Sequence, residues 1–239
     1  MPLFVIEPTQ GSQTSVDLPN ETVADKSIEL LDVILPSTFY KIRTGVNDKL
    51  DFKVGATTYA ITVPAAAYTS TTLLAAIQTL MQSAVANTWA LTFSNDTMLV
   101  TIAATGAFSL LLSSGTNVAT SIGPLLGFAV TDITTVTTTT ATSVIQLFKP
   151  FMLYLRINEM GNNVFVGQTA ALARGFSFLI PATVASGGII EATVNGNYRQ
   201  VIPVKQRTVY PKLTIQLCYS DGTAVNLNGA GYSFLLKIE

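Results

Sequence analysis

The residues that could do chemistry in this sequence are few and widely spaced. Histidine is absent, which removes the usual general base, the usual member of a catalytic triad and the commonest metal ligand. The single cysteine, Cys218, cannot form an intrachain disulfide, and it faces away from its strand neighbours Leu213, Ile215 and Leu217. We interpret it as a structural thiol. The sequence therefore predicts a protein that is not an enzyme, with no catalytic, cofactor-binding or metal-binding residues.

Two pairs of acidic residues are candidate metal-ion ligands. Asp48 and Asp51 flank the entry to a predicted hairpin, and Glu29 and Asp32 lie three residues apart on a predicted strand. Neither pair has the oxygen-rich spacing of a calcium loop. We interpret all four as solvated or interface charges.

Three further patterns have a functional and a structural interpretation. The segment Gly229-Ala230-Gly231 lacks a following helix and a third glycine, so it predicts a β-turn and not a phosphate loop. Trp89 and Phe93 could stack a sugar or a base, but their alternate positions on a strand favour core aromatics. The triplets at Asn20 and Asn95 match glycosylation acceptors; chance explains them in a threonine-rich sequence with no visible secretory signal.

Composition indicates a surface that is covered by something other than water. Only 11% of the 239 residues are charged, and the mean hydropathy is +0.45. The longest apolar run, residues 144–157, is broken by Gln146, Lys149 and Pro150, so it is too short for a membrane span. Neighbouring protein subunits therefore explain better than lipid what covers this surface. The net charge is -1 and the 13 basic residues are scattered, which excludes nucleic acid as a partner.

Residues 48–128 form the most regular block of the sequence. Apolar residues alternate over 50–54 and 59–63 around a Gly55-Ala56 turn, and again over 89–93 and 98–102 around residues 94–97. These alternations predict two β-hairpins, the second including Met98, each with one buried face.

A single amphipathic helix separates the two hairpins. Thr69 is the expected N-cap, with Tyr68 packing on Leu73. The apolar stripe consists of Leu73, Leu74, Ile77, Leu80, Met81 and Ala84. A second, single-turn helix is predicted over 121–128, capped by Ser121 and ended by Gly127 in the left-handed conformation.

Outside this block the sequence predicts strands and turns. Residues 1–25 have the composition of an arm that orders only against a neighbour. Residues 27–36 predict a core strand with a bulge near Leu31 that ends at Pro36. The threonine-rich segment 131–142 predicts an exposed edge strand or loop, with a sugar-bearing or receptor-contacting loop as the alternative.

Later strands are expected over 148–157, 176–180, 189–194, 198–203, 213–219, 224–227 and 232–238. Turns are predicted at Gly161-Asn-Asn163 and Asn195-Gly196. The fold class is therefore all-β: an antiparallel jelly-roll sandwich with one amphipathic helix between two hairpins. We expect an N-terminal arm over 1–25 and a single jelly-roll domain over 26–239.

The order of these features resembles a known protein family. The relevant segments are Ile28-Glu-Leu-Leu-Asp-Val-Ile-Leu-Pro36-Ser-Thr-Phe-Tyr40, Ile61-Thr-Val-Pro64, the leucine-striped helix, Phe108-Ser-Leu-Leu-Leu112, Ile122-Gly-Pro-Leu-Leu-Gly-Phe128, Leu213-Thr-Ile-Gln-Leu-Cys218 with Asp221-Gly222, and Tyr232-Ser-Phe-Leu-Leu-Lys-Ile238. Together they resemble the penton, or minor capsid, proteins of virophages and of Polinton-like and adintovirus-type icosahedral DNA viruses, over most of residues 26–239. The threonine-rich segment has no counterpart in this resemblance.

The resemblance implies a structural capsid protein located in the virion and assembled inside the host cell. It implies a homopentamer at the five-fold vertices of an icosahedral shell, beside a double jelly-roll major capsid protein. One alternative is another minor capsid or cement protein. A second, from a different class, is an adhesin or spike-base β-sandwich that binds a receptor; the sequence shows no internal repeat of the kind a spike tip carries.

Overall fold

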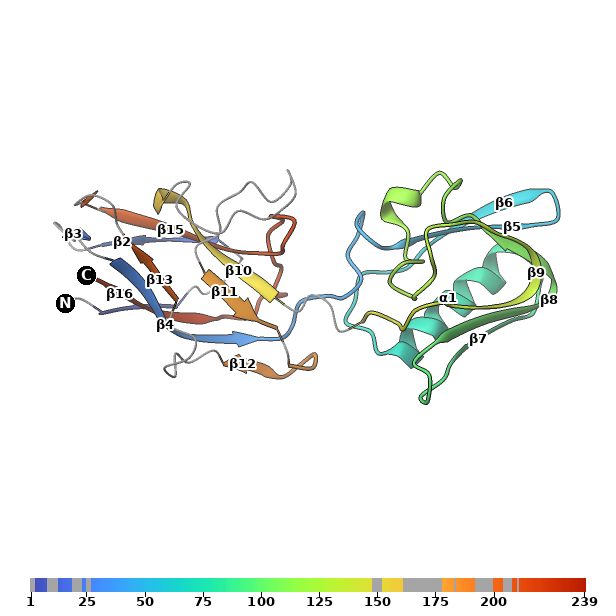
Figure 1. The fold of residues 1–239 in the computed structure, drawn as a ribbon, viewed down its shortest axis with the longest axis horizontal. Coiled ribbons are helices and arrows are strands. Elements are labelled where there is room, and N and C mark those ends of the chain that lie inside the picture. The colour runs from blue at the N-terminus through green and yellow to red at the C-terminus, as the bar shows by residue number, and fades with distance from the viewer. Residues whose placement is uncertain are drawn as a thin grey trace. The chain divides into compact units, whose positions relative to one another are not determined.

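The computed structural model of this chain describes residues 3–7, 13–18, 23–24, 27–147, 152–160, 178–182, 184–191, 200–203, 208–209 and 211–239. They form two compact units, which we call unit 1 (residues 1–39 and 150–239) and unit 2 (residues 40–149). Unit 2 is therefore inserted between two strands of unit 1 (Figure 1). This division differs from the single domain expected over 26–239, because the apolar side chains gather into two separate cores.

Unit 1 is a sandwich of two antiparallel sheets. Sheet A has the order β1-β16-β4-β12, with β13 also on β4, and sheet B has the order β11-β10-β15-β2. A two-stranded ladder joins β14 to β3. The elements are β1 (Leu3–Ile6), β2 (Gln13–Asp17), β3 (Val23–Ala24), β4 (Ser27–Pro36), β10 (Met152–Ile157), the 3-10 turn η2 (Asn158–Met160), β11 (Phe178–Pro181), β12 (Ile189–Glu191), β13 (Gln200–Pro203), β14 (Thr208–Val209), β15 (Lys212–Cys218) and β16 (Ser233–Ile238).

The core of unit 1 lies between the inner faces of the two sheets. Alternate residues of β16 and β4, such as Phe234 and Leu30, meet alternate residues of β10 and β15, such as Leu155 and Leu217, in one buried cluster. This arrangement confirms the predicted all-β, antiparallel jelly-roll sandwich.

Strand β4 has the predicted bulge and the predicted end. Leu235 pairs with Asp32 and the next residue, Leu236, pairs with Leu30, so Leu31 is the extra residue. The bulge restores the inward phase, which is why Val33 and Leu35 are buried as completely as Ile28 is. The strand ends at Pro36, which has no backbone N–H to extend a ladder.

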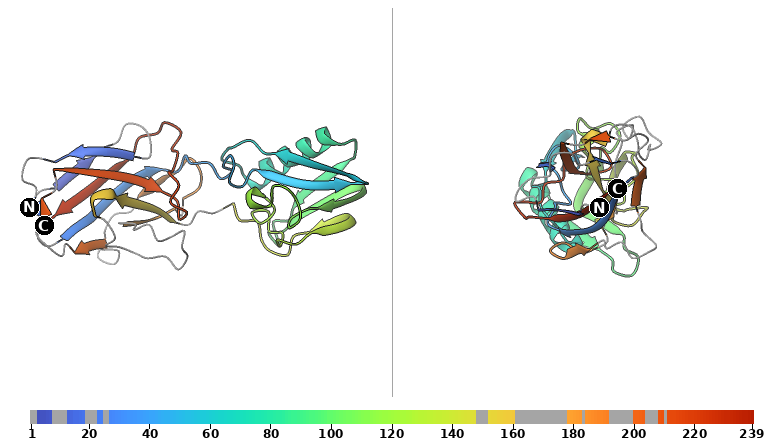
Figure 2. Two further views of the ribbon diagram at one scale, coloured as in Figure 1. Left: turned by 90° about the horizontal axis from the view of Figure 1, so that it is seen from above. Right: turned by 90° about the vertical axis from the view of Figure 1, so that its left-hand side faces the viewer.

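The structure places the described part of residues 1–25 differently from the arm that we expected. β1 pairs with β16 from Leu3↔Lys237 to Ile6↔Phe234, and β2 pairs with β15. Ile6 and Leu18 are buried in the core of unit 1. These segments complete both sheets of their own unit, and β1 brings the two ends of the described chain side by side (Figure 2).

Unit 2 is an antiparallel sheet with one helix packed on it. The sheet has the order β6-β5-β8-β7, and β9 pairs with the other edge of β8. The elements are β5 (Lys49–Val54), β6 (Thr57–Thr62), α1 (Ser70–Ala84), β7 (Trp89–Phe93), β8 (Val100–Leu110), the 3-10 turn η1 (Val118–Thr120) and β9 (Ile133–Thr140).

The two predicted hairpins of unit 2 are confirmed, with one exception. Leu50 and Phe52 are buried, and Gly55 takes the left-handed φ of 60° that the turn requires. The prediction is wrong for Met98, which has a φ of 59° and is 43% exposed. The turn after β7 continues through this residue, so the second strand begins later, at Val100.

Helix α1 begins after the predicted N-cap, Thr69, and runs to Ala84, the last residue of the predicted apolar stripe. The Thr69 hydroxyl accepts a hydrogen bond from Thr72 N at 3.2 Å, and Thr72 Oγ1 accepts one from Thr69 N at 2.9 Å, which forms a capping box. Of the predicted stripe, Leu80 and Ala84 are only half-buried against the core. The helix packs on β6 and β7 through its buried residues Leu73, Leu74, Ile77 and Met81.

The turn over 121–128 has the predicted start and end. Ser121 Oγ accepts from Gly123 N at 3.1 Å, and Leu126 N donates to Ile122 O at 3.1 Å. Gly127 has a φ of 93°, the left-handed conformation predicted for it. The segment is a hydrogen-bonded turn in place of the expected single-turn helix.

Some of the remaining predictions fall on described residues and others outside them. The strand expected over 224–227 is wrong, because Ala224 forms only an isolated bridge with Cys218 and no strand follows it. The threonine-rich segment contains the edge strand β9, most of whose side chains are exposed. The predicted turns at 161–163 and 195–196 and the start of the strand at 148 lie outside the described residues. Among the described residues, no helix is long and apolar enough to cross a membrane.

We predict that Ile77→Asp destabilises unit 2 by about 3–5 kcal/mol, because the change places an unpaired carboxylate where no water reaches. Ala75→Asp, on the exposed side of the same helix, adds the same charge and should change stability little. Urea unfolding of both variants measures the difference. Equal midpoints for the two variants would mean that α1 does not dock through Ile77.

Candidate functional site

The acidic pair of unit 2 is buried, which corrects our interpretation of Asp48 and Asp51 as solvated or interface charges. Asp51 is 3% exposed and accepts two hydrogen bonds of 2.7 Å from Asn117, one from the backbone N and one from Nδ2. Because Asn117 belongs to the loop after β8, Asp51 fastens that loop to the sheet. Asp48 is 1% exposed, and its Oδ1 has no hydrogen-bond partner in the described part of the chain.

The acidic pair of unit 1 also has structural roles. Glu29 is buried, and its Oε2 lies 3.6 Å from Lys237 Nζ on the paired strand. Asp32 is half-buried, and its Oδ1 accepts from Val33 N at 2.9 Å beside the bulge. The prediction of solvated charges is therefore wrong for Glu29 as well. The described residues contain no group of three or more side chains arranged to hold a metal ion.

Cys218 lies where a thiol is unreactive. Its Sγ donates to the carbonyl oxygen of Tyr154 at 3.4 Å, and the side chain is buried. Burial raises the pKa of the thiol to about 11, so almost none of it is thiolate near neutral pH. The geometry agrees with the structural interpretation of this cysteine.

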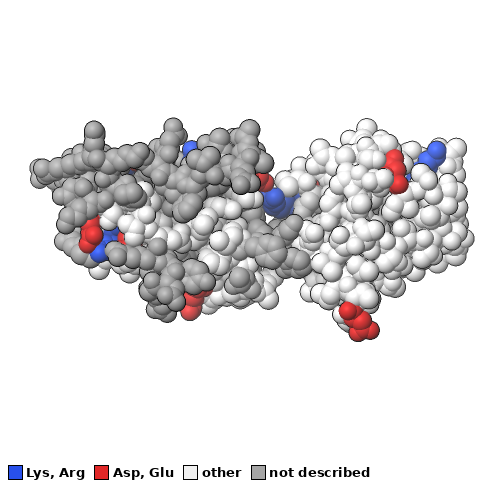
Figure 3. Space-filling model, in the orientation of Figure 1, with Lys and Arg blue, Asp and Glu red and all other residues white. Residues whose placement is uncertain are grey.

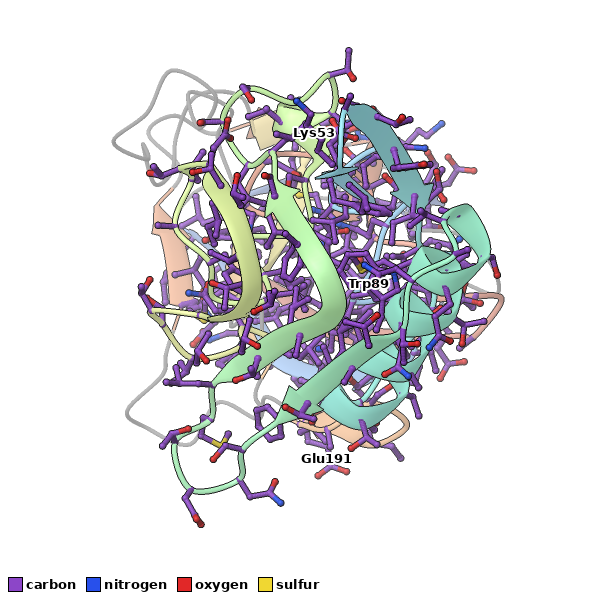
Figure 4. The ribbon with its side chains drawn as sticks, turned by 90° about the vertical axis from the view of Figure 1, so that its right-hand side faces the viewer. Lys53, Trp89 and Glu191 are labelled. Carbon is purple, nitrogen blue, oxygen red and sulfur yellow. The ribbon has the colours of Figure 1, made fainter. Side chains whose placement is uncertain are left out.

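The aromatic pair of β7 belongs to the core of unit 2. Trp89 is 1% exposed and meets Phe52 and Phe108 edge to face, with ring centroids 5.4 and 5.0 Å apart. Figure 4 shows Trp89 between helix α1 and the strands. Phe93 is half-buried against the same cluster. A stacking platform for a sugar or a base would need exposed rings, so Trp89 is not one.

The remaining sequence motifs are turns. Asn228 and Gly229 have φ values of 54° and 84°, and Ala230 N donates to Leu227 O at 3.1 Å, as the β-turn interpretation predicts. Asn95 is exposed in the turn after β7, and the triplet at Asn20 lies outside the described residues.

Sequence reasoning missed an apolar surface on the outer face of sheet A. Five large aliphatic side chains on its strands are exposed to solvent: Leu3 by 56%, Val5 by 68%, Ile34 by 44%, Ile189 by 57% and Val201 by 39%. We call these five residues the sheet A surface. They stand at the outward phase of β1, β4, β12 and β13, between the buried residues of the same strands. The signal was present in the sequence, because Ile34 interrupts the alternation that Val33 and Leu35 define.

A cavity opens at one end of the sheet A surface. Its volume is about 550 Å³. Tyr232 is 5% exposed and its hydroxyl has no hydrogen-bond partner among the described residues, and burial raises its pKa to about 12. The cavity is lined by Glu7, Ile34, Pro36, Ile189, Gly231, Tyr232 and Ser233.

This surface has the composition of a protein contact. Exposed aliphatic residues of neighbouring strands gather beside a cavity, whereas exposed aliphatic residues elsewhere on a monomer are usually scattered. The adjacent Lys237 lies 2.7 Å from Glu239 Oε1 and 3.6 Å from Glu29 Oε2, so this ammonium group is paired within unit 1. The arrangement can bind an apolar side chain of a partner.

Comparisons with known proteins identify a solved structure with a similar fold. No protein-family model and no curated protein sequence matches this chain. The crystal structure of the mavirus penton protein is similar with a TM-score of 0.52 and 8% sequence identity, covering 99% of this chain and 98% of that chain. The flagellar cap protein FliD of Escherichia coli, covered over 57% of the crystallised domains, has a TM-score of 0.19 and 13% identity, too low to support an argument. The mavirus likeness includes both units of this chain.

We predict that Cys218 resists thiol reagents while the protein is folded, because the sulfur is buried and its pKa is raised. Iodoacetamide at pH 8 should label it only after denaturation, which mass spectrometry measures. Stoichiometric labelling of the native protein within minutes would contradict the buried position.

The carboxylate of Asp132 makes the stability of unit 2 depend on pH. Its Oδ1 accepts from Ser113 N at 2.7 Å and from Ser114 N at 3.1 Å, and its Oδ2 accepts from the Ser114 hydroxyl. The hydrogen bond from the Ser114 side chain, followed by that from Ser113 N, lowers the pKa of Asp132 to about 2. Because the pKa is lower in the folded state, this stabilisation is present above pH 4 and is lost as the pH falls toward 2.

We expect Asp132→Asn to lower Tm at pH 7 by about 1–3 °C, a small effect because solvent screens the exposed carboxylate. The difference from the parent should vanish near pH 2. Thermal melts at the two pH values measure both, with Asp96→Asn in the exposed turn after β7 as the control. A difference that persisted unchanged at pH 2 would assign the effect to something other than the charge.

Proposed function

We propose that this chain is a structural capsid protein and the penton subunit of an icosahedral virus particle. The single observation that carries the proposal is the likeness to the mavirus penton protein over 99% of this chain and 98% of that one, through both units. A chance likeness of sandwich folds would account for unit 1 alone. A likeness that covers 99% of this chain extends over the inserted unit 2 as well, and it is more restrictive than a likeness of the sandwich alone.

The surface chemistry supports an assembled state. With 11% charged residues the chain has few of the groups that keep monomers apart, and Figure 3 shows a mostly uncharged visible face on unit 2. The sheet A surface then becomes a contact between subunits. A ring of identical subunits uses two different patches on each copy, which is the geometry of a five-fold vertex.

The proposal includes the partners that the sequence resemblance implies. They are four further copies of the chain in a homopentamer and a double jelly-roll major capsid protein around it, in the virion after assembly in the host cell. No cofactor, metal ion or nucleic acid has a role in this function. A minor cement protein of the same shell is the nearest competing function, and it would occupy positions away from the vertices.

We predict that Ile189→Glu weakens self-association by more than about tenfold while the fold is kept. Ile189 is 57% exposed on the sheet A surface, so a glutamate there costs little in the monomer but would be desolvated in a contact. Ser15→Glu, on an exposed position of sheet B, adds the same charge and should have no effect. Sedimentation velocity and native mass spectrometry measure the oligomer, and thermal melting checks the fold.

The parent protein should form pentamers, and imaging of the particle should place the chain at the vertices. A parent that stays monomeric at high concentration, with and without the major capsid protein, would contradict the proposal. Density for the chain away from the vertices would instead support the cement function.

A further inference from the structure

Three strands of the unit 2 sheet, β6, β7 and β9, have an outer edge that pairs with no described strand. Side chains of α1 occupy the edge of β7, where Leu91 N donates to Gln78 Oε1 at 3.1 Å and Gln82 Nε2 donates to Trp89 O at 3.4 Å. The open edges are therefore β6 and β9. In the described part of the chain no strand pairs with the outer edge of either one. Residues 57–62 of β6 and 133–140 of β9 contain no charged residue and no proline. Natural proteins usually protect such edges with charges, prolines or bulges, because unpaired backbone groups accept a further strand.

Only one protective feature is present, at the start of β9. The ladder between β8 and β9 is irregular between Ala103 and Phe108, and Thr135 has a φ of 52°. This bulge twists the first half of the edge away from regular pairing. The regular half of the edge is the tetrathreonine segment, residues 137–140.

Hydrogen bonds on the inner sides of these strands identify the backbone groups that point outward. On β9, Ala141 N donates to Val100 O at 2.8 Å, so the alternating ladder turns the N–H and C=O groups of Thr138 and Thr140 away from β8. On β6, Val63 N donates to Asp48 O at 2.7 Å, so the N–H and C=O groups of Thr58, Ala60 and Thr62 point away from β5. The side chains of all five outward residues are exposed.

The two edges match in direction and in pleat. The path β6-β5-β8-β9 has three antiparallel steps, so β9 runs opposite to β6. The side chains of the outward residues of both edges also lie on the same face of the sheet, the face opposite α1. The ladder partner of Thr138 is Ala103, and that of Ala60 is Asp51. Each partner is next in its strand to a residue that points into the core on the helix side, Ile102 for Ala103 and Phe52 for Asp51. A strand β9 placed beside a β6 of another copy therefore continues the antiparallel ladder with side chains in phase.

We propose that β9 of one copy adds to β6 of the next copy, so that the sheets of unit 2 join around the ring. The inference rests on the proposed function, since it supplies a second contact within the same head-to-tail oligomer. It also gives the threonine-rich segment a role. Threonines 138 and 140 would lie across from Thr58, Ala60 and Thr62, and facing threonine side chains stabilise antiparallel pairs.

Charges near β6 make this contact testable at a single position of β9. Lys53 pairs with Thr58, and Lys49 pairs with Thr62 and donates its Nζ to the Thr62 hydroxyl at 2.7 Å. Figure 4 labels Lys53 on this part of unit 2. Both lysines belong to β5, the strand next to β6, and their side chains lie on the same face of the sheet as those of Thr58, Ala60 and Thr62. The carboxylate between them, Asp51, is hydrogen-bonded to Asn117. A neighbour's side chain at position 138 would meet a positive field.

We expect Thr138→Lys and Thr138→Glu to behave differently. The lysine variant should raise the concentration at which the oligomer dissociates by about tenfold, while the glutamate variant stays close to the parent, and 0.5 M salt should reduce the difference. Thr138 is exposed, so both variants should melt with the parent. Sedimentation velocity at 50 mM and 500 mM NaCl measures all three proteins, with Ala75→Lys on the exposed side of α1 as the charge control.

Two results would overturn the inference without touching the proposed function. If neither variant changes a pentamer, the β9 edge is not in the contact. If lysine and glutamate weaken it equally, β9 faces another β9 and not β6, because like charges then meet in both cases.

A cross-linking arm identifies the partner strand directly. Thr138→Cys and Ala60→Cys variants, each oxidised alone, should stay uncross-linked, and their mixture should give a disulfide-linked dimer, since Cys218 is buried. Cross-linking of Thr138→Cys alone, or of neither sample, overturns the β9–β6 contact. A parent that is monomeric while the mixture cross-links would overturn the pentamer and retain the edge contact.

Discussion

The ladder between β4 and β16 is the interaction on which unit 1 depends. β4 lies at the centre of sheet A, with β16 on one side and β12 and β13 sharing the other, so most of the sheet is hydrogen-bonded through it. The bulge at Leu31 keeps both halves of the strand in phase with the core. The same ladder carries the pair between Glu29 and Lys237, which lets a carboxylate sit among buried residues.

Much of the fold could be predicted because local patterns and tertiary packing agree. The stripe of α1, its Thr69 cap and the hairpin around Gly55 follow from spacing and turn chemistry alone. Even the bulge near Leu31 could be read from the phase of the apolar residues. Met98 was misplaced because alternation continues through it, while its positive φ reflects a turn that the sequence does not announce.

The division into two units and the candidate surface could not be predicted in the same way. A jelly roll pairs strands from opposite ends of the sequence, and no local sequence pattern predicts that Leu3 pairs with Lys237. Burial of Asp51 depends on Asn117, a residue distant in sequence that supplies two donors. The sheet A surface depends on which face of β4 and β12 the fold turns outward, and a strand with apolar residues on both faces leaves that open.

The insertion of unit 2 gives the two units different histories during synthesis. Every strand of unit 2 comes from residues 40–149, so its hairpins and helix can form while β15 and β16 have not yet been translated. Sheet A, in contrast, cannot form its central ladder before β16 emerges from the ribosome. The β9 edge of a nascent chain is therefore exposed before unit 1 of the same chain has folded. Sheet A pairs strands that are distant in sequence and forms slowly, so the sheet A surface is complete only after β16 has been translated.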